Sequence, residues 1–114
     1  MTNPNPPQPP SAEDREGSEA GPACVMVFNA NDPSGAGGLA ADITAIASVG
    51  AHPLPVVTGA YVRDTGEVFD HFAFDEDAVA EQARTILEDV PVQVIKVGFA
   101  GSAETLSTIA EIAA

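Results

Sequence analysis

A glycine-rich segment that follows an apolar run is the part of this sequence best suited to chemistry. The apolar run at residues 24–28 predicts a buried strand, and an apolar helical pattern begins at Leu39. Between them, residues 31–38 read Asn-Asp-Pro-Ser-Gly-Ala-Gly-Gly, and the glycines leave backbone N–H groups uncovered where the helix begins. A strand, a glycine-rich turn and a helix N-terminus together favour a site for an anion or a polar ligand.

Two residues of this segment and one of the following helix have candidate roles. Gly37 would let a ligand ring approach the backbone closely, or it serves only a tight turn of positive φ. Asp32 precedes a proline and is expected to shape the loop through an Asx turn. Asp42 falls inside the apolar arc of its helix, where the sequence offers it no evident partner. We place Asp42 in the first helical turn, where its carboxylate either benefits from the helix dipole or faces a site.

These residues must be positioned by alternating strands and helices. We predict strands at residues 24–28, 54–62 and 92–97, an edge strand at 67–72, and helices at 39–49 and 75–90. A last helix is capped by Ser102 and carries Leu106, Ile109 and Ala113 on one face. The alternation of strands and helices predicts an α/β fold with a mainly parallel sheet and flanking helices. We expect the strand at residues 92–97 to be buried.

Composition limits the partners. The 114 residues carry a net charge of −13, which disfavours nucleic acids and anionic membranes as partners. Residues 1–22 are rich in proline and acidic residues and are predicted to be a disordered tail, so the domain begins at residue 23. The tail lacks the basic start and apolar core of a secretory signal, and no apolar run is long enough to span a bilayer. We therefore expect a soluble, cytoplasmic protein.

The glycine-rich string resembles the first signature of the hydroxymethylpyrimidine/phosphomethylpyrimidine kinases, in the ribokinase-like superfamily. That family carries a strand followed by the pattern G-S-D-P-S-G-G-A-G-I-Q-A-D. The matching residues here are Asp32, Pro33, Ser34, Gly35, Gly38, Ala41 and Asp42. Ala30 and Asn31 replace the family's Gly-Ser, and Ala36-Gly37 inverts its Gly-Ala. The resemblance continues through residues 48–51, 56–58, 64–65 and 96–98 to the end of the chain.

The resemblance implies that residues 23–114 are the N-terminal part of a ribokinase-like kinase domain, in a chain that looks truncated. The full enzyme would phosphorylate hydroxymethylpyrimidine and its monophosphate with ATP and Mg²⁺ in thiamine biosynthesis, and it would be a homodimer. The family aspartate equivalent to Asp42 lines the pyrimidine pocket, so the resemblance assigns Asp42 to substrate binding.

Three positions depart from the family. Arg63 stands where the family has a glutamine that hydrogen-bonds the pyrimidine, and Asp64 replaces an asparagine. Arginine offers only donors, so either Arg63 pairs with an acid and leaves the site, or the ligand presents acceptors or a phosphate there. Phe99 replaces a methionine after the last strand, in which Lys96 interrupts the apolar residues. Phe99 would either stack on a flat ring or pack in the core.

The catalytic motif of the family is missing from this sequence, so no residue here is assigned a catalytic role. The Gly-x-Gly-Asp motif, whose aspartate is the family's general base, does not occur in these residues. His52 and His71 lack the spacing of a metal site and are expected at the surface or in turns. The leading hypothesis is therefore the substrate-side half of such a kinase, inactive as it stands and holding neither ATP nor a metal by itself. The alternatives are a pyridoxal/pyridoxine kinase of the same superfamily and a non-catalytic ligand-binding module.

Overall fold

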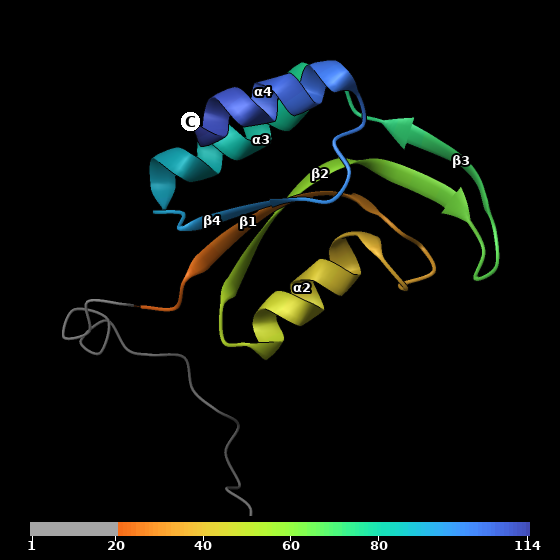
Figure 1. Cartoon of the computed structure of the whole chain (residues 1–114), viewed down its shortest axis with the longest axis horizontal. Coiled ribbons are helices and arrows are strands. Elements are labelled where there is room, and N and C mark those ends of the chain that lie inside the picture. Colours follow the sequence, from red (N-terminus) through yellow and green to blue (C-terminus); the bar gives the residue numbers. More distant parts are fainter. Residues whose placement is uncertain (1–20) are drawn as a thin grey trace, which may run out of the picture.

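A computed structural model describes residues 21–114 as one four-stranded sheet with helices on both faces (Figure 1). The predicted tail at residues 1–22 lies outside the described residues except for Gly21 and Pro22. The elements in chain order are β1 (Cys24–Asn31), α2 (Gly38–Ser48), β2 (His52–Arg63), β3 (Val68–Ala73), α3 (Glu76–Asp89), β4 (Val94–Val97) and α4 (Ala103–Ala113).

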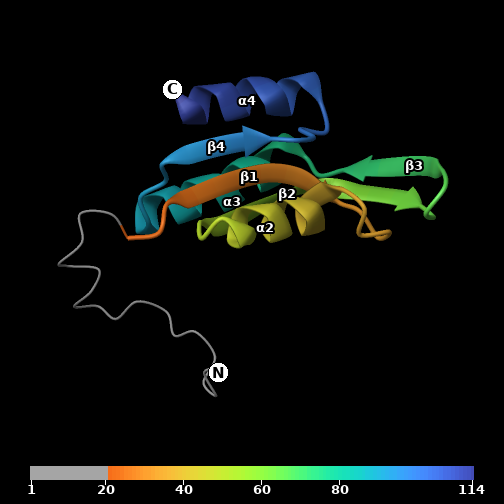
Figure 2. The same ribbon diagram turned by 60° about the horizontal axis from the view of Figure 1, so that its bottom comes forward.

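The sheet has the order β3-β2-β1-β4, with β1 parallel to both β2 and β4. Strand β3 pairs antiparallel with β2 and forms one edge, as the sequence predicted for residues 67–72. Figure 1 and Figure 2 show the β2–β3 hairpin extending past the carboxyl end of β1. The predicted α/β fold with a mainly parallel sheet is confirmed.

Helix α2 covers one face of the sheet, and α3 and α4 lie on the other (Figure 1). The main core lies between the sheet and the α3–α4 layer. It consists of Met26, Phe28, Val56, Val79, Ala83 and Ile109, all buried. Burial of such apolar side chains is the main stabilising contribution in a fold of this size.

One prediction of burial is wrong. Strand β4 spans only Val94–Val97 and is an edge strand, with Val94 51% and Val97 39% exposed, because no described residue pairs with its outer side. In α4 the predicted apolar face is only partly buried: Ile109 is buried, whereas Leu106 is 51% exposed. The helix instead buries two threonines, since the Thr108 hydroxyl bonds Glu76 of α3 and the Thr105 amide bonds the Ser102 cap.

In the first half of β2, before its pairing with β3 begins, a side chain of α3 occupies the hydrogen-bonding groups of the outer edge. Strand β3 pairs with β2 only from Gly59 onward. Before that point, the Gln82 side chain of α3 accepts from Val57 N at 3.0 Å and donates to Val57 O at 2.9 Å, as a neighbouring strand would. Pro53 and Pro55 have no N–H to donate, so this stretch of edge offers an incoming strand little to bind.

Candidate functional site

The predicted site residues lie toward the carboxyl ends of the parallel strands. The glycine loop (residues 32–37) connects the end of β1 to α2, Arg63 ends β2, and Phe99 follows β4. Gly37 is the N-cap residue of α2 with φ −143°, so the alternative of a tight turn of positive φ does not apply to it. Gly38 has that conformation, with φ +63°, and a Cβ there would lie 2.5 Å from the carbonyl oxygen of Ala30. Glycine is therefore required at 38 by conformation and by space.

Asp32 organises the glycine loop from within. Its Oδ1 accepts from Ser34 N at 2.9 Å and from the Ser34 hydroxyl at 2.7 Å, and its Oδ2 accepts from Gly37 N at 2.9 Å. The hydrogen bond from the Ser34 hydroxyl, helped by the two amides, holds the pKa of Asp32 below its usual value. The predicted Asx turn is confirmed. The amides of Ser34 and Gly37, which the sequence left open to an anion, bind Asp32 instead.

Arg63 joins the end of β2 to this loop. Its Nη1 lies 3.5 Å from Asp32 Oδ2, and its Nε donates to the backbone oxygen of Asp64 at 3.0 Å. Of the two readings of Arg63, pairing with an acid is the one seen. The pairing keeps Arg63 beside the loop, however, because its partner is Asp32 rather than the Asp64 carboxylate. That carboxylate accepts from the amides of Gly66 and Glu67 in the β2–β3 turn.

Asp42 is buried between α2 and the sheet, and it has two partners. Helix α2 begins at Gly38, so Asp42 lies in the second turn, and the prediction of the first turn is wrong. Asn29 Nδ2 of β1 donates to Asp42 Oδ2 at 2.7 Å, and Lys96 Nζ of β4 bonds Oδ1. The expectation that a structural aspartate here lacks a partner is therefore also wrong. Burial alone would raise the pKa of Asp42, but the bonds from Asn29 and Lys96 outweigh it and lower the pKa below its usual value.

An aromatic cluster lies beyond β4. The ring of Phe99 is 5.4 Å from that of Tyr61, at 43°, and 5.6 Å from that of His71, edge-on. Phe99 is half-buried and lies outside the core cluster, so core packing is not its role. The prediction of surface positions for His52 and His71 is confirmed, since both are exposed. Tyr61, Phe99 and His71 thus form a partly open aromatic surface at the carboxyl ends of β2 and β4.

Sequence reasoning missed Asn29. It follows the apolar run directly and is buried, and a buried asparagine at a strand end is itself a sign of a specific hydrogen-bond partner. From the sequence, Lys96 is noted only as a charged residue within an otherwise apolar strand. The structure brings Asn29, Asp42 and Lys96 together from three elements, and it brings Asp32 and Arg63 together from two.

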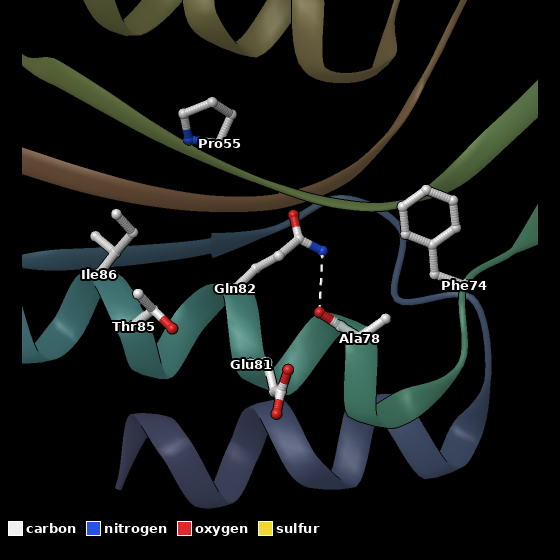
Figure 3. A pocket seen from close by; sticks show the side chains of 7 residues that line it. All are labelled: Pro55, Phe74, Ala78, Glu81, Gln82, Thr85 and Ile86. Atoms are coloured by element: carbon white, nitrogen blue, oxygen red, sulfur yellow. Dashed lines mark hydrogen bonds between the residues drawn. The ribbon is translucent and has the colours of Figure 1, made fainter.

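A pocket of about 640 Å³ lies elsewhere, between β2 and α3 (Figure 3). Figure 3 shows Gln82 pointing from α3 toward β2 while it bonds the carbonyl of Ala78. The pocket is lined by Pro55, Phe74, Ala78, Glu81, Gln82, Thr85 and Ile86. No residue of the predicted site lines it, so we do not assign it to that site.

Two observations on the described residues concern the binding of a nucleotide or a metal ion. Among residues 21–114, no three or more histidine, cysteine or acidic side chains gather in a way that could hold a metal. Two amides of the glycine loop that could hold a phosphate already bind the Asp32 carboxylate.

Among residues 21–114, no helix combines the length and the apolar character needed to cross a membrane.

The sheet order, the glycine loop and the residues at the strand ends define an α/β domain of the ribokinase-like class. The chain belongs to the phosphomethylpyrimidine kinase family, whose sequence model matches residues 32–114. It is 30% identical over 93 residues to the hydroxymethylpyrimidine/phosphomethylpyrimidine kinase of Streptomyces coelicolor, covering 82% of this chain and 35% of that protein. The corresponding kinase of Mycobacterium tuberculosis is 32% identical over 89 residues, or 78% of this chain and 32% of that one.

Solved structures give the same fold. The phosphomethylpyrimidine kinase of Clostridium difficile superposes with a TM-score of 0.72 at 25% identity, covering 78% of this chain and 38% of that one. Pyridoxal kinase from Staphylococcus aureus, solved with pyridoxal, gives a TM-score of 0.74 at 20% identity over 82% of this chain and 36% of that one. The chain therefore spans about a third of the length of its relatives.

Proposed function

We propose that this chain is the substrate-binding portion of a hydroxymethylpyrimidine/phosphomethylpyrimidine kinase of thiamine biosynthesis. One arrangement carries the proposal: the glycine loop, Asp42, Arg63 and Phe99 lie toward the carboxyl ends of strands β1, β2 and β4. Ligands of open α/β sheets bind in the crevice outside these strand ends. Membership of the phosphomethylpyrimidine kinase family supports a small pyrimidine as the ligand.

Each residue has a role that fits its chemistry. The ionised carboxylate of Asp42 can accept a hydrogen bond from the exocyclic amine of an aminopyrimidine. Gly37, which lacks a side chain, lets the flat ring approach the backbone. The partly open ring of Phe99 offers a face on which that ring can stack. Arg63 supplies donors beside the loop, where a ligand acceptor would compete with Asp32 for them.

We further propose that phosphoryl transfer needs parts that this chain does not supply. The chain covers 35% of its Streptomyces relative and contains no Gly-x-Gly-Asp motif. Phosphoryl transfer depends on positioning and on stabilising the negative charge that spreads over the transferred group. ATP and Mg²⁺ would be held by the rest of a whole enzyme, which we expect to be a homodimer. By itself the chain would bind substrate without phosphorylating it.

Arg63 favours one second candidate, a pyridoxal kinase. Its guanidinium can only donate, and the formyl and phenolate oxygens of pyridoxal are acceptors, whereas an aminopyrimidine presents an amine donor. Under this reading Arg63 exchanges Asp32 for a ligand oxygen, and Asp42 has no amine to bind. The two candidates therefore differ in whether Asp42 binds an amine of the ligand.

Calorimetric titration of the full chain with hydroxymethylpyrimidine and with pyridoxal tests the proposal. We expect binding of the pyrimidine and a loss of roughly one to two decades of affinity in Asp42→Asn, since a hydrogen bond to a charged group contributes about 1.5–3 kcal/mol. Asp89→Asn, at the far end of α3, is the matched control and should bind as the parent does. Tighter binding of pyridoxal, unaffected by Asp42→Asn, would replace the pyrimidine assignment with the pyridoxal one.

A further inference from the structure

Asn29 is held in one orientation by the backbone around it. The register between β1 and β2 shifts between Asn29 and Ala30, and the amide of Ala30 donates to Asn29 Oδ1 at 2.8 Å. Because the oxygen end of the side chain is occupied in this way, its NH₂ end is the one directed at Asp42. The distance from Nδ2 to Asp42 Oδ2 is 2.7 Å.

Gly98 leaves the space that this orientation needs. A Cβ atom at position 98 would lie 2.3 Å from Asn29 Nδ2 and 2.7 Å from its Cγ. Real Cβ atoms do not approach other atoms so closely, so any larger residue would displace the Asn29 amide. The backbone of Gly98 is itself fixed, because its amide donates to Phe28 O at 2.8 Å.

The second oxygen of Asp42 meets a cation. Lys96 Nζ bonds Oδ1, and the side chain of Lys96 is 54% exposed while that of Asp42 is 9% exposed. Among residues 21–114, Lys96 is the charged side chain that contacts Asp42. Each carboxylate oxygen thus has one donor from a different strand, and each can accept a further hydrogen bond.

We propose that Asn29 is a positioning residue, which fixes the Asp42 carboxylate so that its remaining lone pairs accept N–H groups of a heteroaromatic ligand. The inference rests on the proposed function, in which Asp42 contacts the ring. Lys96 neutralises the carboxylate from the other side, and Gly98 keeps the Asn29 amide in place. Asn29 itself need not touch the ligand.

The test combines two measurements on the full chain: carboxyl ¹³C NMR titration of Asp42 and calorimetric titration with hydroxymethylpyrimidine. In Asn29→Ala we expect the titration midpoint of Asp42 to rise and the affinity at pH 7 to fall about ten-fold, as for loss of a bond to a charged group. Asn31→Ala, an exposed asparagine at the end of the same strand, is the matched control and should leave the Asp42 midpoint unchanged.

A second, nearly isosteric variant guards against loss of the fold. Asn29→Asp places two carboxyl groups together, and they should share one proton. Its affinity relative to the parent at the same pH should therefore recover as the pH is lowered from 7 to 5, because the protonated group again donates to Asp42. A chain that had lost its fold at both pH values would give no such recovery.

The outcomes separate the two proposals. An Asp42 midpoint and an affinity that both stay at the parent values in Asn29→Ala would overturn the positioning role, as would a fall in affinity with no change in the midpoint. A parent chain that does not bind hydroxymethylpyrimidine would instead overturn the proposed function. In that case the titration midpoint of Asp42 in Asn29→Ala, compared with the parent, shows whether Asn29 stabilises the ionised form of Asp42.

Discussion

The guanidinium of Arg63 lies 3.5 Å from the carboxylate of Asp32, and this contact ties the end of β2 to the loop that follows β1. The same carboxylate accepts from Ser34 and Gly37 within the loop. Asp32 therefore fixes the loop internally and also places it against the neighbouring strand. The geometry of the candidate site depends on this one buried side chain.

Replacing Asp32 should loosen the loop and destabilise the fold. Asp32→Asn removes the negative charge to which three donors of the loop and Arg63 bind. We therefore expect a lower urea midpoint of unfolding than for the parent chain. Asp70→Asn, on the exposed strand β3, is the matched control and should differ little. The prediction is wrong if the two variants unfold at the same urea concentration.

Stability should fall at acid pH. The folded structure lowers the pKa of Asp32, Asp42 and Asp64 from the ordinary value of 3.8. The unfolded chain therefore binds more protons than the folded chain in this range, so the stabilisation is complete above about pH 5 and is lost as the pH falls through 3.8 and below. Urea unfolding between pH 7 and pH 3 measures this loss.

Asp42→Asn supplies the control for the acid effect. It removes one of the three lowered pKa values, so its free energy of unfolding should fall less steeply with decreasing pH than that of the parent. Equal slopes in the two chains would show that Asp42 does not contribute to the acid sensitivity.

Arg63→Gln should raise the affinity for hydroxymethylpyrimidine. A glutamine offers a donor and an acceptor together, which suits an aminopyrimidine edge better than the donors of arginine. We expect a gain of up to about ten-fold, the equivalent of one neutral hydrogen bond, in a calorimetric titration. Arg84→Gln on α3 controls for the change in net charge. A loss of affinity for pyridoxal, with no gain for the pyrimidine, would favour the second candidate.

The chain by itself should not phosphorylate its substrate. Purified chain with Mg-ATP and hydroxymethylpyrimidine should yield no more product than a reaction without protein, because the sequence contains no Gly-x-Gly-Asp motif and, among residues 21–114, the amides of Ser34 and Gly37 already bind Asp32. Product that Asp42→Asn abolishes would contradict this, whereas product that the variant leaves unchanged would indicate a contaminating kinase.

The outer edge of β4 should cause self-association. Val94 is 51% and Val97 is 39% exposed there, and an unpaired apolar edge is a template for pairing with another strand. Sedimentation velocity should show concentration-dependent association that Val97→Lys weakens. Val49→Lys, at an apolar residue after α2 that is 80% exposed, should not weaken it. A strictly monomeric parent with a sharp thermal transition would show that the β4 edge needs no partner.

The sequence by itself determined the order of strands and helices, the glycine loop and the Asx turn of Asp32. These are local properties: apolar periodicity, turn residues and a side chain bonding amides two and five residues away all lie within a short stretch of chain. The capping by Ser102 and the helix start at Asp75 were predictable for the same reason.

Only the tertiary structure decided what Asp42 and Arg63 bind. Asn29 and Lys96 lie 13 and 54 residues from Asp42, and Asp32 lies 31 residues from Arg63, so no local pattern records these pairs. The exposure of β4 is likewise a matter of sheet order, because three of its four residues are as apolar as those of a central strand. Burial and pairing depend on which segments meet in space, and that is fixed when the sheet assembles.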